Sequence, residues 1–164
     1  NKYFDGIIPT NVSTRTDFDD DIESFTKSQI SEVEEALDTY HISNGLAEIW
    51  AIIARTNKYI DETAPWALAK SEDEADKEKL KSVMFHLAEN LRKVAIMVAP
   101  FMPETATKML SQLGLDSKNK AWDLVHSDTE IKEGTKVIAQ GEPLFVRLDK
   151  EEEIEYIKAS MQGK

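Results

Sequence analysis

Asn57-Lys-Tyr-Ile-Asp-Glu-Thr-Ala-Pro-Trp-Ala-Leu-Ala-Lys70 is the stretch that decides how this chain folds. Pro65 fixes its own φ, has no N–H to donate and biases Ala64 away from helical geometry. A long helix should therefore end near Thr63, and a new helix should start at Pro65 or Trp66. The stretch predicts two consecutive helices joined by a sharp turn.

The same turn should present one indole. Trp66 would sit at a helix start, where backbone N–H groups point outward, with basic and amide side chains nearby: Arg55, Asn57, Lys58 and Lys70. Such a set of groups can stack on an unpaired base and contact its phosphates. The other reading is that Trp66 fills the gap between two helices, as aromatic residues often do in bundles. Stacking requires that at least one ring face of Trp66 be accessible to solvent.

The apolar periodicity on either side of this stretch is helical. Apolar residues recur at intervals of three to five over 22–40, share one stripe over 46–60 and keep a three-to-four spacing over 80–98. A shorter helix is expected over 104–113, after Pro100 and Pro103. In the 80–98 segment the apolar stripe leaves Arg92 and Lys93 outside. Residues 136–139 and 144–148 read as short extended pieces that could pair as a hairpin. The sequence predicts an all-α antiparallel bundle of about four or five helices with a short irregular or β-containing tail.

The helix before the turn carries its aliphatic residues on one stripe, which includes Ile49, Trp50 and Ile53. Trp50 lies in the middle of this stripe and should be almost wholly buried. Asn57 falls on the same stripe. Its amide is either buried and bonded to a neighbouring helix or held at the bundle edge, where a base could reach it.

Charge argues against binding of nucleic acid at large. The formal net charge is −11, and acidic residues gather in 17–23 and 151–155. The first of these clusters reads as a solvated helix start that compensates the helix dipole. Residues 51–70 hold three bases against two acids, so the region of the turn is locally +1. The chain could read a few splayed bases while another domain supplies most of the backbone affinity.

Composition also limits the chemistry. The chain has no cysteine, and His41, His86 and His126 are not grouped at the spacing of metal ligands, so no metal site is expected. There is no glycine-rich phosphate loop and no arrangement of a nucleophile with an oriented base. No secretory segment and no run of about 20 apolar residues is present, which predicts a soluble, cytoplasmic protein without a membrane partner.

Three stretches together resemble the anticodon-binding domain of bacterial methionyl-tRNA synthetases. These are the 57–70 segment preceded by Leu46-Ala-Glu-Ile-Trp50, the opening Asn1-Lys-Tyr-Phe-Asp-Gly6, and Pro143-Leu-Phe-Val-Arg-Leu148. In that family the tryptophan of the Ala-Pro-Trp step packs against anticodon bases. The resemblance therefore implies that Trp66 is the recognition residue and Pro65 its positioning neighbour.

The resemblance also implies the rest of the assignment. The tRNA-binding set would be Trp66, Pro65, Asn57, Lys58 and Arg55, and the partners would be the anticodon loop of methionine tRNA and the catalytic domain of the same chain, with no DNA. Residues 1–133 would form the helical domain, and 134–164 a tail that packs on the bundle or on the catalytic domain. The full-length methionine–tRNA ligase would use ATP with magnesium in that catalytic domain. The present stretch should need no cofactor and be inactive alone, since it has neither nucleotide-binding signature of class I synthetases.

Two departures from the family pattern are visible. The asparagine and arginine that make further anticodon contacts in the family lie just before the point where this sequence starts, and Val146 stands where related sequences often have proline. Two alternatives stay open. One is the anticodon domain of a valine, isoleucine, leucine or cysteine synthetase. The other is a non-enzymatic helical scaffold that binds a protein through an apolar patch around Trp66.

Overall fold

The computed structural model describes residues 3–118, 120–128, 130–145 and 147–162, and Val146 lies outside these described residues. The described part is helical, which confirms the all-α prediction. The helices are α1 (Asp19–Asp38), α2 (Ile42–Thr63), α3 (Pro65–Leu68), α4 (Glu74–Val98), α5 (Pro103–Gln112) and α6 (Lys150–Gln162), with two 3-10 turns, η1 (Phe4–Gly6) and η2 (Trp122–His126).

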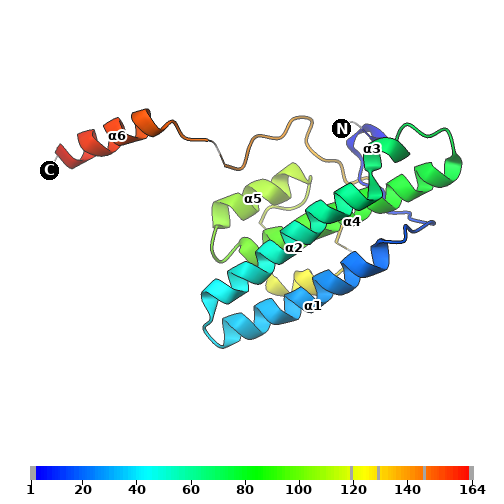
Figure 1. Cartoon of the computed structure of the whole chain (residues 1–164), viewed down its shortest axis with the longest axis horizontal. Helices are drawn as coiled ribbons and strands as arrows, with labels where there is room; N and C mark the ends of the chain where they lie inside the picture. The colour runs from blue at the N-terminus through cyan, green and yellow to red at the C-terminus, as the bar shows by residue number, and fades with distance from the viewer. Residues whose placement is uncertain (1–2, 119, 129, 146, 163–164) are drawn as a thin grey trace.

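Three long helices, α1, α2 and α4, form the body of the bundle (Figure 1). The short connection between α1 and α2 makes them antiparallel neighbours, and α2 and α4 also pack on one another. The single turn of α3 sits at the end of α2 and rests on α4, while α5 and η2 cover α4 elsewhere. The α2–α3 corner is therefore placed at one end of the bundle.

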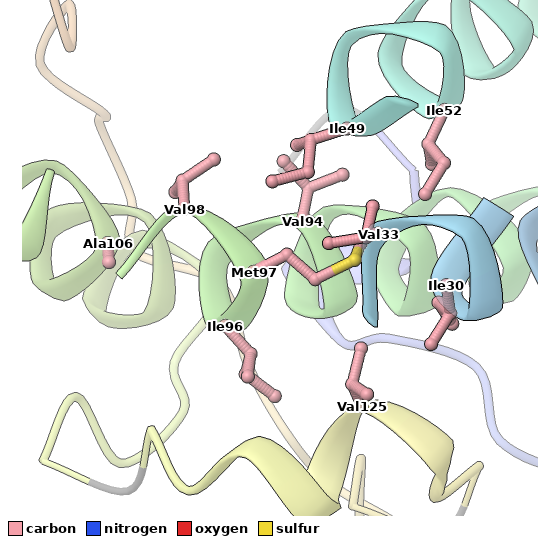
Figure 2. Packing of buried hydrophobic residues seen from close by; sticks show 10 residues of the cluster. All are labelled: Ile30, Val33, Ile49, Ile52, Val94, Ile96, Met97, Val98, Ala106 and Val125. Atoms are coloured by element: carbon pink, nitrogen blue, oxygen red, sulfur yellow. The ribbon is translucent and has the colours of Figure 1, made fainter. Parts of the chain in front are cut away.

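The main core lies where these elements meet (Figure 2). Buried side chains converge from α1, α2, α4, α5 and η2 into one cluster: Ile30, Val33, Ile49, Ile52, Val94, Ile96, Met97, Val98, Ala106 and Val125.

The helix ends follow local rules. The side chain of Asp73 caps α4 by accepting the Ala75 N–H at 2.9 Å, and Pro103 starts α5, where no N–H is needed.

The expected position of Arg92 on the outside of its helix is wrong. Its side chain is 2 % exposed, and it donates from Nε and Nη2 to Glu89 Oε2 at 2.9 and 2.7 Å. Nη1 donates to the carbonyl of Leu124 at 2.7 Å, and Nη2 also donates to the carbonyl of Ser127. The α4 helix is covered on several sides, so an arginine that is paired with a carboxylate and hydrogen-bonded to two carbonyls can lie inside. Arg92 thereby fastens η2 to α4.

The tail differs from the expected hairpin. Lys136 forms an antiparallel bridge with Ile7 instead of pairing within the tail, and the described residues contain no longer strand. Ile8 donates its N–H to the carbonyl of Thr135, and Val137 donates to Gly6, each at 2.9 Å. The β content of the tail is thus this one bridge. Helix α6 was not expected from the sequence, and it extends away from the bundle (Figure 1).

Gly114 allows the tail to approach α5. Its φ is +73°, and a Cβ at this position would lie 2.0 Å from the carbonyl oxygen of Lys136. Only glycine fits both the left-handed conformation and the close backbone. Across the described residues, no helix is long and apolar enough to cross a bilayer.

Candidate nucleic-acid interface

The turn between α2 and α3 has the geometry that Pro65 predicts. Helix α2 ends at Thr63, and α3 begins at Pro65. Ala64, between them, has φ 42° and ψ 60°, a left-handed conformation that is unusual for a residue with a Cβ. The backbone N–H of Ala64 still reaches the carbonyl of Ile60 at 3.0 Å, so the chain reverses its course without losing the last helical bond.

Trp66 is presented on the outside of this corner. Its exposed fraction is 47 %, which confirms the expectation of an accessible ring, and within the described residues no hydrogen bond engages its indole N–H. Two other residues of the same short helix face inward, since Pro65 is buried and Leu68 packs on a small core cluster. The short helix is therefore anchored by residues on either side of Trp66, and the indole is left facing solvent.

The backbone of α3 offers fewer donors than the sequence suggested. Ala67 and Leu68 both donate their N–H groups to the carbonyl of Ala64, at 2.8 and 3.3 Å. The helix is also only one turn long, too short to develop a useful dipole. The expectation that free amides beside Trp66 would bind phosphate is thus not supported, and the indole face is the feature that remains.

Arg55 is engaged by acidic side chains of α1 and α2. Its side chain is only 10 % exposed and lies between two acids. Nε donates to Asp21 at 2.9 Å, and Nη1 lies 3.0 Å from Glu62 Oε2. The structure thus uses Arg55 to link α2 to α1, which leaves its guanidinium little freedom to reach a phosphate.

Asn57 and Lys58 are both exposed on α2. Asn57 was expected on the buried stripe but lies outside it. Within the described residues its amide has no hydrogen-bond partner. Lys58 forms an ion pair with Glu62 at 3.2 Å, but its side chain is 69 % exposed, and such surface pairs break at little cost. Both side chains are available to a ligand that approaches α2 from solvent.

Trp50 contradicts the sequence prediction, because it is 50 % exposed. The buried positions of α2 are Gly45, Ile49, Ile52, Thr56, Tyr59 and Thr63, spaced alternately by four and three. The hydroxyls of Thr56 and Thr63 donate to the main-chain carbonyls of Ile52 and Tyr59, at 2.8 and 2.7 Å, so both threonines can be buried. A reading based only on aliphatic residues misplaced the stripe by about one position.

An apolar groove lies beside Trp50. It is lined by Ser43, Leu46, Ala47, Trp50, Phe101 and Met102. The groove sits near the start of α2, whereas Trp66 follows its end. The apolar patch that a protein-binding scaffold would need is therefore centred on a different tryptophan from the one presented at the corner.

A buried carboxylate lies beneath the corner, where the sequence predicted a solvated one. Asp19 is completely buried, and it accepts hydrogen bonds from the hydroxyl of Tyr59 at 2.6 Å and from the hydroxyl of Ser82 at 2.5 Å. The backbone N–H of Thr16 donates to it at 2.8 Å, and the Thr16 hydroxyl donates as well. Asp19 thus connects α1, α2 and α4.

These contacts determine the ionisation of the group. Burial by itself would raise the pKa of Asp19, but the hydrogen bonds from Ser82, Thr16 and Tyr59 outweigh it and hold the pKa below its ordinary value. Burial and the bond to Asp19 raise the pKa of the Tyr59 hydroxyl, which stays protonated as the donor. The sequence did carry a signal for this arrangement: in Thr16-Asp-Phe-Asp19 the acidic side chain lies three residues after a threonine, a spacing at which it can accept the threonine N–H, as Asp19 does.

Each histidine lies within hydrogen-bonding distance of one or more described side chains. His86 is buried with Nε2 2.6 Å from Glu23, and His126 Nε2 lies 2.8 Å from Glu34. Nδ1 of His41 lies 2.9 Å from the hydroxyl of Thr39. In the part of the chain that the structure describes, no cluster of three or more His, Cys, Asp or Glu residues could hold a metal ion.

The architecture is similar to part of solved methionyl-tRNA synthetase structures. The bundle is similar to part of the Mycobacterium tuberculosis methionyl-tRNA synthetase in complex with methionyl-adenylate, with a TM-score of 0.79 and 28 % sequence identity. The match covers 88 % of this chain and 28 % of that one. The apo form of the same enzyme gives a TM-score of 0.77.

Sequence comparison defines the family. The model of the anticodon binding domain of methionyl tRNA ligase matches residues 8–164, and the chain belongs to that family. It is 49 % identical to the methionine–tRNA ligase of Bacillus subtilis and 48 % identical to that of Listeria innocua, in each case over 99 % of this chain. The chain spans about a quarter of the length of these relatives, 24 % in both.

Proposed function

We propose that this chain is the part of a methionine–tRNA ligase that recognises the anticodon of methionine tRNA, with Trp66 as the side chain that stacks on an anticodon base. The observation that carries the proposal is the presentation of Trp66: an indole that is 47 % exposed on a corner anchored by buried neighbours. A rigid, exposed aromatic ring suits stacking on a splayed base, because little conformational entropy is lost on binding.

Asn57 and Lys58 would assist from the exposed face of α2. Asn57 lies six residues before the end of α2, which is about 9 Å along the helix at about 1.5 Å per residue. A loop of several nucleotides could therefore contact Asn57 and Trp66 at the same time. Pro65 fixes the backbone of the corner and, because it has no N–H, cannot donate a backbone hydrogen bond to the ligand. Arg55 supports α2 through its ion pairs with Asp21 and Glu62. The proposed roles are thus recognition by Trp66, polar contact by Asn57 and Lys58, and support by Pro65 and Arg55.

The rest of the ligase would supply the chemistry and most of the affinity for the tRNA backbone. A formal charge of −11 does not favour extended contact with phosphates, so a partner domain of the same chain should provide it. That domain would activate methionine with ATP and magnesium and transfer it to the tRNA in the cytoplasm. Residues 1–133 would form the reading domain and 134–164 the tail that leads towards the catalytic domain.

The experiment is Trp66→Ala in the full-length ligase that contains this chain. Loss of one stacked base costs roughly 1–3 kcal/mol, so the dissociation constant for methionine tRNA should rise by about one to two decades. Methionine-dependent exchange between ATP and pyrophosphate should stay almost unchanged, because it takes place in another domain.

Trp50→Ala is the matched control, since Trp50 is on the adjoining helix and equally exposed. It should change tRNA affinity by less than about twofold. If Trp66→Ala lowered the exchange activity together with tRNA binding, loss of folding would explain both effects and the stacking role would be wrong.

A further inference from the structure

The underside of the α2–α3 corner is a small core of its own. Ile22 from α1, Tyr59 from α2 and Val83 from α4 are buried together, and Leu68 of α3 packs against this cluster. Leu68 is two residues beyond Trp66 in the same helical turn. The position of the Trp66 turn therefore depends on where the Tyr59 ring lies.

Tyr59 is held at several of its atoms. Its hydroxyl donates to Asp19 at 2.6 Å, its ring belongs to the cluster, and its carbonyl accepts the hydroxyl of Thr63 at 2.7 Å. The residue is fully buried. A hydrogen bond to a carboxylate inside the protein is short and directional, so it determines the position of the ring as well as satisfying the hydroxyl.

Asp19 is itself fixed from three sides. Ser82 of α4 and Thr16, just before α1, both donate to it, besides Tyr59 of α2. A carboxylate with this set of donors cannot shift without breaking bonds to other helices. It therefore fixes the positions of α1, α2 and α4 relative to one another beside the corner.

The backbone of the corner needs such support. Ala64 has a φ of 42°, a conformation that persists for a residue with a side chain only when its surroundings impose it. The residues on both sides of Ala64 are buried, and Thr63 is bonded to Tyr59. The ring of Tyr59 thus constrains the corner from the α3 side, through Leu68, while the bond from Thr63 to the main-chain carbonyl of Tyr59 holds the end of α2.

We infer that Asp19 is a positioning residue for Trp66: through the hydroxyl of Tyr59 it holds the α2–α3 corner in the orientation that presents the indole to a base. The inference rests on the proposed function, since it assigns the Asp19–Tyr59 bond to the same tRNA site. Asp19 does not touch the ligand in this account. Its effect on tRNA binding is exerted entirely through Trp66.

Tyr59→Phe in the full-length ligase is the test, because it removes only the hydroxyl. The dissociation constant for methionine tRNA should rise about three- to tenfold, because Trp66 would no longer be held in the orientation that stacks on the base. In a Trp66→Ala background the same change should raise it by less than about twofold. Ile96→Val is the control: it removes one methylene group from the main core and should leave tRNA affinity unchanged in both backgrounds.

The two ideas fail in different ways. If Trp66→Ala alone leaves tRNA binding intact, the proposed function is wrong and the positioning role is lost with it. If Trp66→Ala weakens binding but Tyr59→Phe acts equally in both backgrounds, Tyr59 is merely structural and only the positioning role is overturned. Ser82→Ala gives a second route to the same carboxylate, and its effect on tRNA affinity should likewise depend on the presence of Trp66.

Discussion

Replacement of Arg92 tests how the bundle is held together. The guanidinium is 2 % exposed, and the residue beside it, Glu89, is 5 % exposed. Arg92→Met would leave the Glu89 carboxylate buried without a counter-ion, and it would also remove the donors to the carbonyls of Leu124 and Ser127. Breaking a buried pair from one side costs about 3–5 kcal/mol.

For a chain of 164 residues this loss corresponds to a fall in Tm of about 6–20 °C. The free energy of unfolding is measured by urea titration of this chain, followed by circular dichroism at 222 nm, with Tm from a thermal scan. Glu89→Gln combined with Arg92→Met is the informative control, because it removes both charges. It should recover about 1–3 kcal/mol relative to Arg92→Met alone. A loss below about 1 kcal/mol in the single variant, or no recovery in the double variant, would refute the reasoning.

Two further substitutions test the buried Asp19 carboxylate beneath the corner and the close approach of the tail to Gly114. The pKa of Asp19 is lower in the folded state than the value of about 3.9 in an unfolded chain, so its contribution to stability is complete above pH of about 4 and is lost as the pH falls through the folded pKa. Asp19→Asn should therefore be much less stable than the parent at pH 6, and the gap should narrow at pH 3; urea midpoints at the two pH values measure it, and an equal gap would exclude the assigned ionisation. Gly114→Ala should destabilise the chain by about 1–2 kcal/mol or more and speed hydrogen exchange at the Ile8 and Val137 amides, because the new Cβ would meet the Lys136 carbonyl. Gly134→Ala, with φ +81° but no atom within 4 Å of a Cβ, is its control, and equal exchange in both variants would argue against the close approach.

The corner itself was predictable from sequence because proline acts locally. Pro65 has no N–H and restricts the residue before it, so the end of α2 at Thr63 and the start of α3 follow from residue types alone. The exposure of Trp66 did not follow from residue types alone, because these also allowed the ring to fill a gap between two helices. It was expected from the resemblance to the anticodon-binding domain, and the ring is exposed. What surrounds the corner depended on tertiary contacts and was harder to read.

The errors over Trp50 and Asp19 share one cause: polar residues that are buried because they find hydrogen-bond partners. Thr56 and Thr63 bond to their own helix and count as buried, which shifts the true stripe of α2 and turns Trp50 outward. Asp19 was assigned to solvent by its charge, yet Tyr59 and Ser82 supply donors from 40 and 63 residues away. Periodicity shows which residues are apolar, but it does not show which polar groups find partners.

The most direct test of the central claim is discrimination between anticodons. The dissociation constant of the full-length ligase is measured for methionine tRNA and for the same tRNA carrying the anticodon of a different amino acid, with and without Trp66→Ala. If Trp66 stacks on a base that the loop splays out only when it carries the native anticodon, the unmodified ligase should prefer the native anticodon by about two decades or more, and Trp66→Ala should remove at least about one decade of that preference. A variant that loses affinity for both tRNAs equally, or keeps the full preference, would contradict the assignment of base recognition to Trp66.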